Sequence, residues 1–70
     1  MTPKAALKKA LEIVGGPSAL SRELRITSQA VSQWRRAPAR QVLKIERITG
    51  VSRHELRPDF YPREHAEAAE

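Results

Sequence analysis

Hydrophobic residues recur along the chain at helical spacing, in short segments separated by brief breaks, most of which contain glycine or proline. In KAALKKALEIV, leucine, alanine and valine fall three or four residues apart, with lysine and glutamate between them. The breaks come at residues 15–17, 25–27 and 37–38 and at Gly50, and no segment between them alternates as a strand does. The pattern therefore predicts an all-α domain of five short helices.

Capping residues set the expected bounds of the first two helices. Thr2 is a suitable N-cap and Pro3 suits the first helical position, where its missing N–H is harmless. The first helix is therefore expected to run from about Pro3 or Lys4 to Val14 and to end at Gly15. The second helix is expected over residues 17–24.

The same signals bound the remaining three helices. Thr27 is a good N-cap for a third helix, which should run to about Arg36. A fourth is expected over residues 38–49, again with proline at its start. The spacing of serine and glutamate in SRHE, residues 52–55, is that of a capping box and predicts a one-turn helix ended by Pro58.

The helical spacing also predicts which residues face the core. They are Leu7, Ala10, Leu11, Val14, Ala19, Leu20, Leu24, Ala30, Val31, Trp34, Val42, Ile45, Ile48 and Thr49. Leu43 points away from the stripe of its helix and needs another neighbour. Phe60 and Tyr61, which lie between two prolines, are expected to pack back on the core. These three residues are also the candidate homodimer contacts, and the alternative is that they complete the core of the monomer.

Seventy residues provide one small domain and no room for a second core. We expect this domain to span residues 1–62, because REHAEAAE, residues 63–70, is too polar to bury itself and predicts a flexible tail. Apolar runs are too short for a signal peptide or a membrane span. The lack of cysteine excludes disulfides and thiolate zinc sites and fits a cytoplasmic protein.

The net charge of +5 is unevenly distributed. Residues 1–58 hold twelve of the thirteen Lys and Arg residues and four of the eight acidic residues, which leaves a charge of +8, whereas residues 59–70 carry −3. A basic body favours an anionic partner, nucleic acid before a membrane surface. Charge alone is also compatible with a merely solvated basic surface.

The segment ELRITSQAVSQW carries uncharged polar residues where an exposed helix ordinarily carries lysine and glutamate. Trp34 shares the apolar face with Ala30 and Val31, and this spacing favours a core position over stacking on a base. The opposite face holds the candidates for base reading, with Arg36 beside them: Ser28, Gln29, Ser32 and Gln33. Glutamine can donate to and accept from the adenine edge in the major groove, and serine permits close approach. The alternative is a solubilising surface.

Residues 17–36 have the proportions of a helix-turn-helix. Near its start, Ser18 can offer its hydroxyl and nearby backbone N–H groups to a phosphate. Five arginines around the unit are the candidate phosphate contacts: Arg22, Arg25, Arg35, Arg36 and Arg40. Arg40, Lys44 and Arg47 face either solvent or a DNA backbone. This arrangement predicts a double-stranded DNA partner whose bases are read by the polar face and whose backbone is held by arginine.

The stretch GGPSALSRELRITSQAVSQWRR resembles the helix-turn-helix of Cro- and cI-type phage repressors. The wider frame, LKKALEIVGGPSALSRELRITSQAVSQW followed by IERITGVSRHELRPDFYP, is similar to the Cro/YdaS-like group of prophage regulators over residues 4–62. The resemblance implies a lambda-repressor-like fold and a transcriptional regulator, usually a repressor, of a bacterial or phage-infected cell. Its operators would be palindromic, and a weak homodimer that forms mainly on DNA would suit them.

The turn of the motif departs from the family pattern. The family usually has glycine where this chain has Arg25, because that residue often adopts a positive φ, and a side chain there costs on the order of 1 kcal/mol. Either the substitution is simply tolerated, or Arg25 adds a phosphate contact. Ser21 stands where alanine is common and is small enough to keep the helix contact.

Two other functions remain open from the sequence. The resemblance also admits an antitoxin-like protein that acts mainly through a protein partner and binds DNA for autoregulation, although the short tail argues against it. Charge-driven binding to RNA or a membrane would show no sequence preference, and the first helix could lie on a membrane, but its apolar stripe is better explained by the core.

No catalytic or metal site is predicted. His54 and His65 have no third ligand at a useful spacing. Four carboxylates show no pairing suited to acid–base catalysis: Glu23, Glu46, Glu55 and Asp59. We therefore expect no enzyme activity, no cofactor and no small-molecule substrate.

Overall fold

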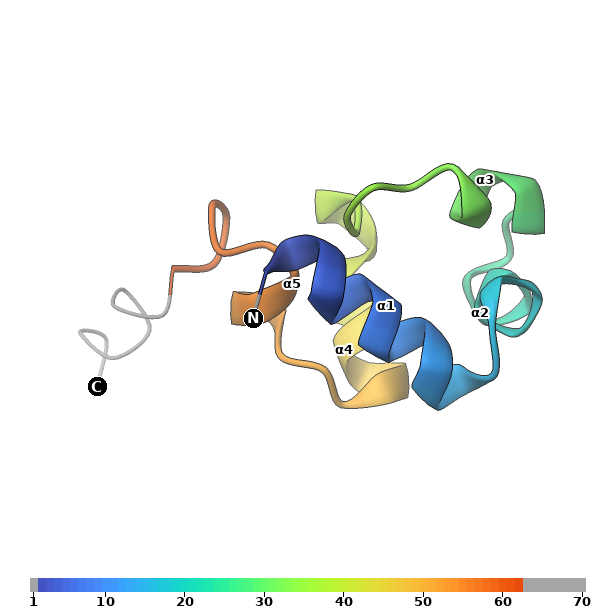
Figure 1. Cartoon of the computed structure of the whole chain (residues 1–70), viewed down its shortest axis with the longest axis horizontal. Helices are drawn as coiled ribbons and strands as arrows, with labels where there is room; N and C mark the ends of the chain where they lie inside the picture. The colour runs from blue at the N-terminus through green and yellow to red at the C-terminus, as the bar shows by residue number, and fades with distance from the viewer. Residues whose placement is uncertain (1, 63–70) are drawn as a thin grey trace.

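The computed structural model describes residues 2–62, and every regular element within them is helical. In chain order these elements are α1 Pro3–Val14, α2 Pro17–Leu24, α3 Ser28–Ser32, the 3₁₀ turn η1 Ala39–Gln41, α4 Val42–Thr49 and α5 Arg53–Leu56. In Figure 1, α1 lies in the middle, α2 and α3 lie at one end, and α5 lies toward the other. The predicted all-α fold with five short helices is confirmed. The predicted tail, residues 63–70, lies outside the described residues.

The helix caps follow the sequence signals. The hydroxyls of Thr2, Thr27 and Ser52 each accept a hydrogen bond of 3.1 Å from a backbone N–H two or three residues later. Each bond supplies one of the partners that a helix start lacks. Gly15 (φ 101°) and Gly50 (φ 81°) end α1 and α4 in the left-handed region, which favours glycine.

The prediction that the third helix runs to Arg36 is wrong, because α3 ends at Ser32. Gln33 keeps a helical backbone as the cap residue (φ −86°, ψ −10°), and the Trp34 N–H still donates to the Val31 carbonyl at 3.1 Å. The chain then leaves the helix. Arg36 therefore does not continue the polar face of α3 as the helical periodicity suggested.

The prediction that the fourth helix starts at Pro38 is also wrong. Pro38 is extended (ψ 142°), residues 39–41 form the 3₁₀ turn, and α4 begins only at Val42. Ala37, which precedes Pro38, is fully buried, so the loop between α3 and η1 turns into the core at this point.

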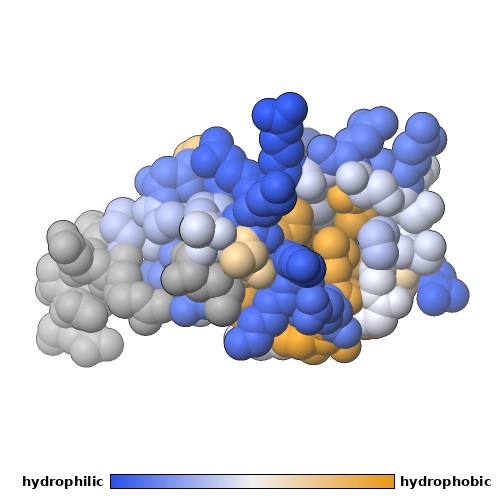
Figure 2. Space-filling view, viewed as in Figure 1, coloured by the Kyte–Doolittle hydropathy of each residue, from blue (hydrophilic) through white to orange (hydrophobic). Residues whose placement is uncertain are grey.

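All the residues predicted to face inward are buried or half-buried. The buried core also contains residues that the helical spacing did not single out: Ala6, Ala37, Val51 and Leu56. Trp34 is half-buried against α1, where it lines a hollow of about 220 Å³ with Leu7 and Leu11. Figure 2 shows apolar surface on this face, bordered by hydrophilic residues.

The three candidate dimer contacts have different surroundings. Leu43 points away from the core, as predicted, and is 45% exposed. Tyr61 packs against the core, as predicted. The prediction that Phe60 packs on the core is wrong, since it is 58% exposed. Its ring instead lies 4.7 Å from the guanidinium of Arg57, a cation–π contact at the surface.

Arg25 caps α2 in the left-handed region (φ 59°, ψ 44°) and is the only non-glycine residue with a positive φ between residues 2 and 62. Replacing Arg25 with glycine removes the steric clash of Cβ that strains this backbone. Glycine also raises the conformational entropy of the unfolded chain, but this costs less than the removed clash. We expect the melting temperature to rise by roughly 2–6 °C in thermal unfolding. Arg25→Ala is the matched control, because it keeps Cβ and should give no rise; an equal rise in both variants would contradict the strain.

Candidate nucleic-acid interface

The turn between α2 and α3 is held by backbone and side-chain hydrogen bonds. The Ile26 N–H donates to the Ser21 carbonyl at 3.0 Å, and the Ser21 hydroxyl donates to the Ser18 carbonyl at 2.7 Å. Ser21 is itself 5% exposed, which confirms that serine fits this position. Val31, which is 1% exposed, anchors α3. The two helices therefore form one helix-turn-helix unit.

The structure brings the four candidate base-reading residues together on α3 and its C-terminal cap. Ser28, Gln29, Ser32 and Gln33 are all exposed, and the helix docks through Val31 on its other side. In the part of the chain that the structure describes, none of these four side chains is hydrogen-bonded to the protein. Their amides and hydroxyls are therefore available to a partner.

The start of α2 is open to solvent. Its cap, Gly16, has no side chain to accept a hydrogen bond, and Pro17 has no N–H. The first backbone hydrogen bond into the helix joins the Leu20 N–H to the Gly16 carbonyl at 3.1 Å. The N–H groups of the first turn lack partners within the helix. Ser18 is exposed beside them, so its hydroxyl and these N–H groups can bind an anion together.

The candidate phosphate contacts lie in the chain on both sides of α3. All of them are exposed, and across residues 2–62 none forms an ion pair: Arg22, Arg25, Arg35, Arg36 and Arg40. Arg35 and Arg36 lie in the loop after α3, and Arg40 lies in η1. Arg25 differs from the others, because it lines a hollow with residues of α4.

Arg57 holds the loop after α3 in place, although nothing in the sequence pattern singles it out. It is only 9% exposed, and its Nη1 donates to the carbonyl of Ala37 at 3.1 Å. Its Nε and Nη2 donate to the two carboxylate oxygens of Asp59 at 3.0 and 2.7 Å. A bidentate pair of this kind fixes geometry as well as charge. The loop that carries Arg35 and Arg36 is thereby tied to the segment that follows α5.

The ion pair between Arg57 and Asp59 predicts a dependence of stability on pH. The hydrogen bonds from Arg57, with a smaller effect of Arg36, lower the pKa of Asp59 to about 2. A carboxylate with a depressed pKa stabilises the fold above its unfolded pKa of about 4, and this contribution is lost as the pH falls through the folded value.

We expect the chain to have a higher urea midpoint than the Asp59→Asn variant above about pH 5, and the difference to disappear between about pH 4 and pH 2. Urea unfolding of both proteins across this range measures the difference. A gap that persists unchanged at pH 2 would show that the ionised carboxylate is not responsible.

The described residues contain no group of three His, Cys, Asp or Glu residues placed to hold a metal ion. His54 is engaged in the fold, because its Nδ1 lies 2.8 Å from the carbonyl of Tyr61, which can only accept a hydrogen bond. The other histidine, His65, lies outside the described residues. No helix of residues 2–62 has the length and apolar character needed to cross a membrane.

Comparisons with known proteins found one matching family and one similar curated protein. Residues 7–65 match the family described as "Bacterial toxin YdaS". The chain is 42% identical over 61 residues to a protein of Escherichia coli (strain K12) described as "Putative transcriptional regulator YdaS". The aligned part covers 79% of this chain and 62% of that relative, so the chain spans less than two thirds of its length. No solved structure matches the chain significantly.

Proposed function

The chain belongs to the YdaS family, and we propose that it is a transcriptional regulator that binds double-stranded DNA in a sequence-specific manner, as a Cro-type prophage repressor. The observation that carries this proposal is the exposed face of α3, where Ser28, Gln29, Ser32 and Gln33 have no hydrogen-bond partner among residues 2–62. The description of the Escherichia coli relative as a transcriptional regulator supports it.

In the proposed complex, α3 lies in the major groove. Gln29 and Gln33 can each make a bidentate pair with the N6 and N7 of adenine, and Ser28 and Ser32 allow close approach. The arginines that form no ion pair within residues 2–62 and the open start of α2 at Ser18 hold the phosphates on either side. The bound protein would repress by covering promoter DNA, which requires no effector domain.

We propose that the repressor binds palindromic operators as a weak homodimer. Leu43 and Phe60 are large apolar residues that remain exposed, and such groups are typical of contact surfaces. Tyr61 is half-buried and would contribute only its edge. A two-fold pair of this domain would place two copies of α3 about 34 Å apart, one turn of DNA.

Selection of bound sequences from random duplexes at about 150 mM salt tests the proposal, because nonspecific attraction is damped at this concentration. We expect a palindromic consensus from the chain. A Gln29→Ala, Gln33→Ala double variant should lose this consensus while it still binds DNA weakly. If the unaltered chain enriches no consensus, the proposed function fails.

Arg40 provides a test of backbone contact as distinct from base reading. Arg40→Ala should weaken binding to all duplexes alike and reduce the slope of log affinity against log salt by about 0.9, the effect of one phosphate contact. Lys9→Ala removes the same charge from an exposed position on α1 and is the matched control. Equal slopes for the two variants would remove Arg40 from the interface.

A second candidate function rests on the family description, which names a toxin, whereas the resemblance noted from the sequence admitted an antitoxin-like protein. Either role would work mainly through a protein partner, with DNA binding for autoregulation. Expression of the chain with and without Gln29→Ala and Gln33→Ala discriminates this partner-directed role from the proposed DNA-binding regulator. Growth arrest that does not depend on these glutamines would favour the partner-directed role. Charge-driven binding to RNA or a membrane would instead be indifferent to both glutamines in a binding assay.

A further inference from the structure

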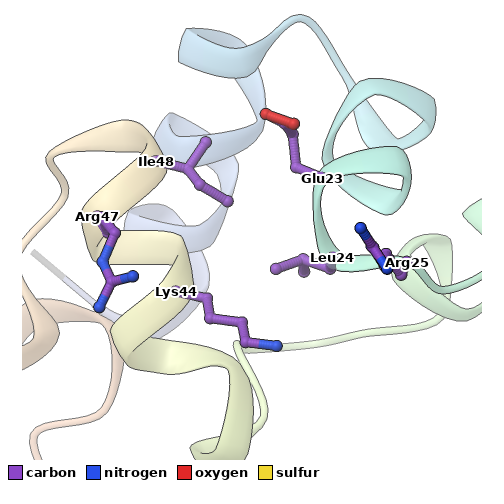
Figure 3. A pocket seen from close by; sticks show the side chains of 6 residues that line it. All are labelled: Glu23, Leu24, Arg25, Lys44, Arg47 and Ile48. Carbon is purple, nitrogen blue, oxygen red and sulfur yellow. The ribbon is translucent and has the colours of Figure 1, made fainter.

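A hollow of about 310 Å³ lies between the end of α2 and the outer face of α4. Its lining residues are Glu23, Leu24, Arg25, Lys44, Arg47 and Ile48. Figure 3 shows Lys44 extending from α4 toward the α2 side, with Leu24 and Ile48 between the two helices. Leu24 is 4% exposed and Ile48 is half-buried, so the floor of the hollow is apolar.

The charges around this hollow do not balance. Arg25, Lys44 and Arg47 contribute three positive groups, against the single carboxylate of Glu23. None of the four forms an ion pair in the part of the chain that the structure describes. The side chain of Glu23 points away from Lys44 in Figure 3. The rim therefore carries a net positive charge that residues 2–62 leave uncompensated.

This hollow is separate from the base-reading face. No residue of α3 lines it, whereas Ser28, Gln29, Ser32 and Gln33 are all on α3 or its cap. Arg25 lies at the opposite end of α2 from Ser18, about 10 Å along the helix axis at 1.5 Å per residue. A partner seated here would leave the glutamine side chains free.

We propose that this hollow binds an acidic segment of a protein partner, whose carboxylates pair with Arg25, Lys44 and Arg47 and whose apolar side chain covers Leu24 and Ile48. A DNA phosphate would use the cations but gain nothing from an apolar floor. A segment that alternates acidic and apolar residues uses both, since a buried apolar anchor inside a charged rim is a common interface design. The proposal deepens the second candidate function and is independent of DNA reading by α3.

The presence of arginine at position 25 agrees with this proposal. Its left-handed backbone costs on the order of 1 kcal/mol relative to glycine, and its guanidinium makes no ion pair within residues 2–62 that would offset the cost. A contact with a carboxylate of a partner would supply the missing compensation. Arg25→Gly should therefore stabilise the free chain but weaken the partner complex.

A display selection of random 12-residue peptides against the full chain tests the proposal. We expect enriched peptides to combine aspartate or glutamate with a large apolar residue. The affinity of a synthetic enriched peptide should fall about tenfold or more for Lys44→Glu with Arg47→Glu. Lys8→Glu with Lys9→Glu changes the charge equally outside the hollow and should change the affinity less than about twofold. Replacing the acidic residues of the peptide with Asn and Gln should also abolish binding.

Three results would overturn the proposal. They are the absence of acidic enriched peptides, equal loss of affinity in the two charge-reversed variants, and a loss of DNA affinity that is larger for the α4 pair than for the α1 pair. The last result would assign the hollow to DNA. If charge reversal unfolds the chain, Lys44→Gln with Arg47→Gln replaces it, with Lys8→Gln and Lys9→Gln as control. DNA binding by the unaltered chain, measured in parallel, separates failure of this site from failure of base reading.

Discussion

Replacing Gln33 with alanine is expected to weaken binding to the best selected duplex by roughly 5- to 150-fold, which corresponds to the 1–3 kcal/mol of one bidentate base contact. The glutamine amide is exposed and makes no hydrogen bond within the described residues, so it is available to a base. Because a bidentate pair involves one base, the loss should be confined to one base position in each half-site. Gln29→Ala should behave in the same way at a different position. Fluorescence anisotropy with duplexes substituted at single base pairs measures both effects.

Glu12→Ala is the matched control for these variants, since it truncates an exposed side chain on α1 without touching α3. It should leave the ranking of duplexes unchanged. If Gln33→Ala weakens binding to every duplex by the same factor relative to the unaltered chain, the residue contributes no base discrimination. Its place in the proposed interface would then be lost.

Replacing Arg57 with alanine is expected to lower the free energy of unfolding by about 2–4 kcal/mol, a large share for a domain of this size. The substitution leaves the carbonyl of the fully buried Ala37 without its donor and removes the cation–π contact with Phe60. A fall in melting temperature of roughly 10 °C or more should follow. Thermal and urea unfolding measure the loss.

Arg53 provides a matched control for this effect. It also pairs with a carboxylate, that of Glu46 at 3.0 Å, and lies over an aromatic ring, that of Tyr61, but its side chain is 43% exposed. Arg53→Ala should therefore cost less than about 1 kcal/mol. Comparable losses for Arg53→Ala and Arg57→Ala would contradict the anchoring role of Arg57.

The helix bounds that local chemistry determines could be predicted from the sequence. Thr2, Thr27 and Ser52 cap their helices as expected, because an N-cap needs only a hydroxyl and the next few backbone groups. The end of α3 could not be predicted, because the Trp34–Arg35–Arg36 run is compatible with helix by propensity. The burial of Ala37 and its bond to Arg57, twenty residues away, draw the chain out of the helix instead.

The candidate site divides in the same way. The polar face of α3 follows from a helical period over a few residues, so it could be read from the sequence, and its four members are exposed as expected. Phe60 was assigned to the core because it lies between two prolines, but its ring lies at the surface against Arg57. The hollow between α2 and α4 depends on how two helices pack, and spacing along one helix carries no information about it.

A double-mutant cycle between a glutamine of α3 and an adenine of the selected site tests base reading most directly. 7-Deazaadenine lacks the N7 acceptor and keeps the base pair, so it removes one half of the proposed contact. At one position it should weaken binding of the unaltered chain and have no further effect on Gln33→Ala, with a coupling energy of about 1 kcal/mol or more. If 7-deazaadenine lowers the affinity of the unaltered chain and of Gln33→Ala equally at every adenine, and Gln29→Ala gives the same result, these side chains do not read the bases.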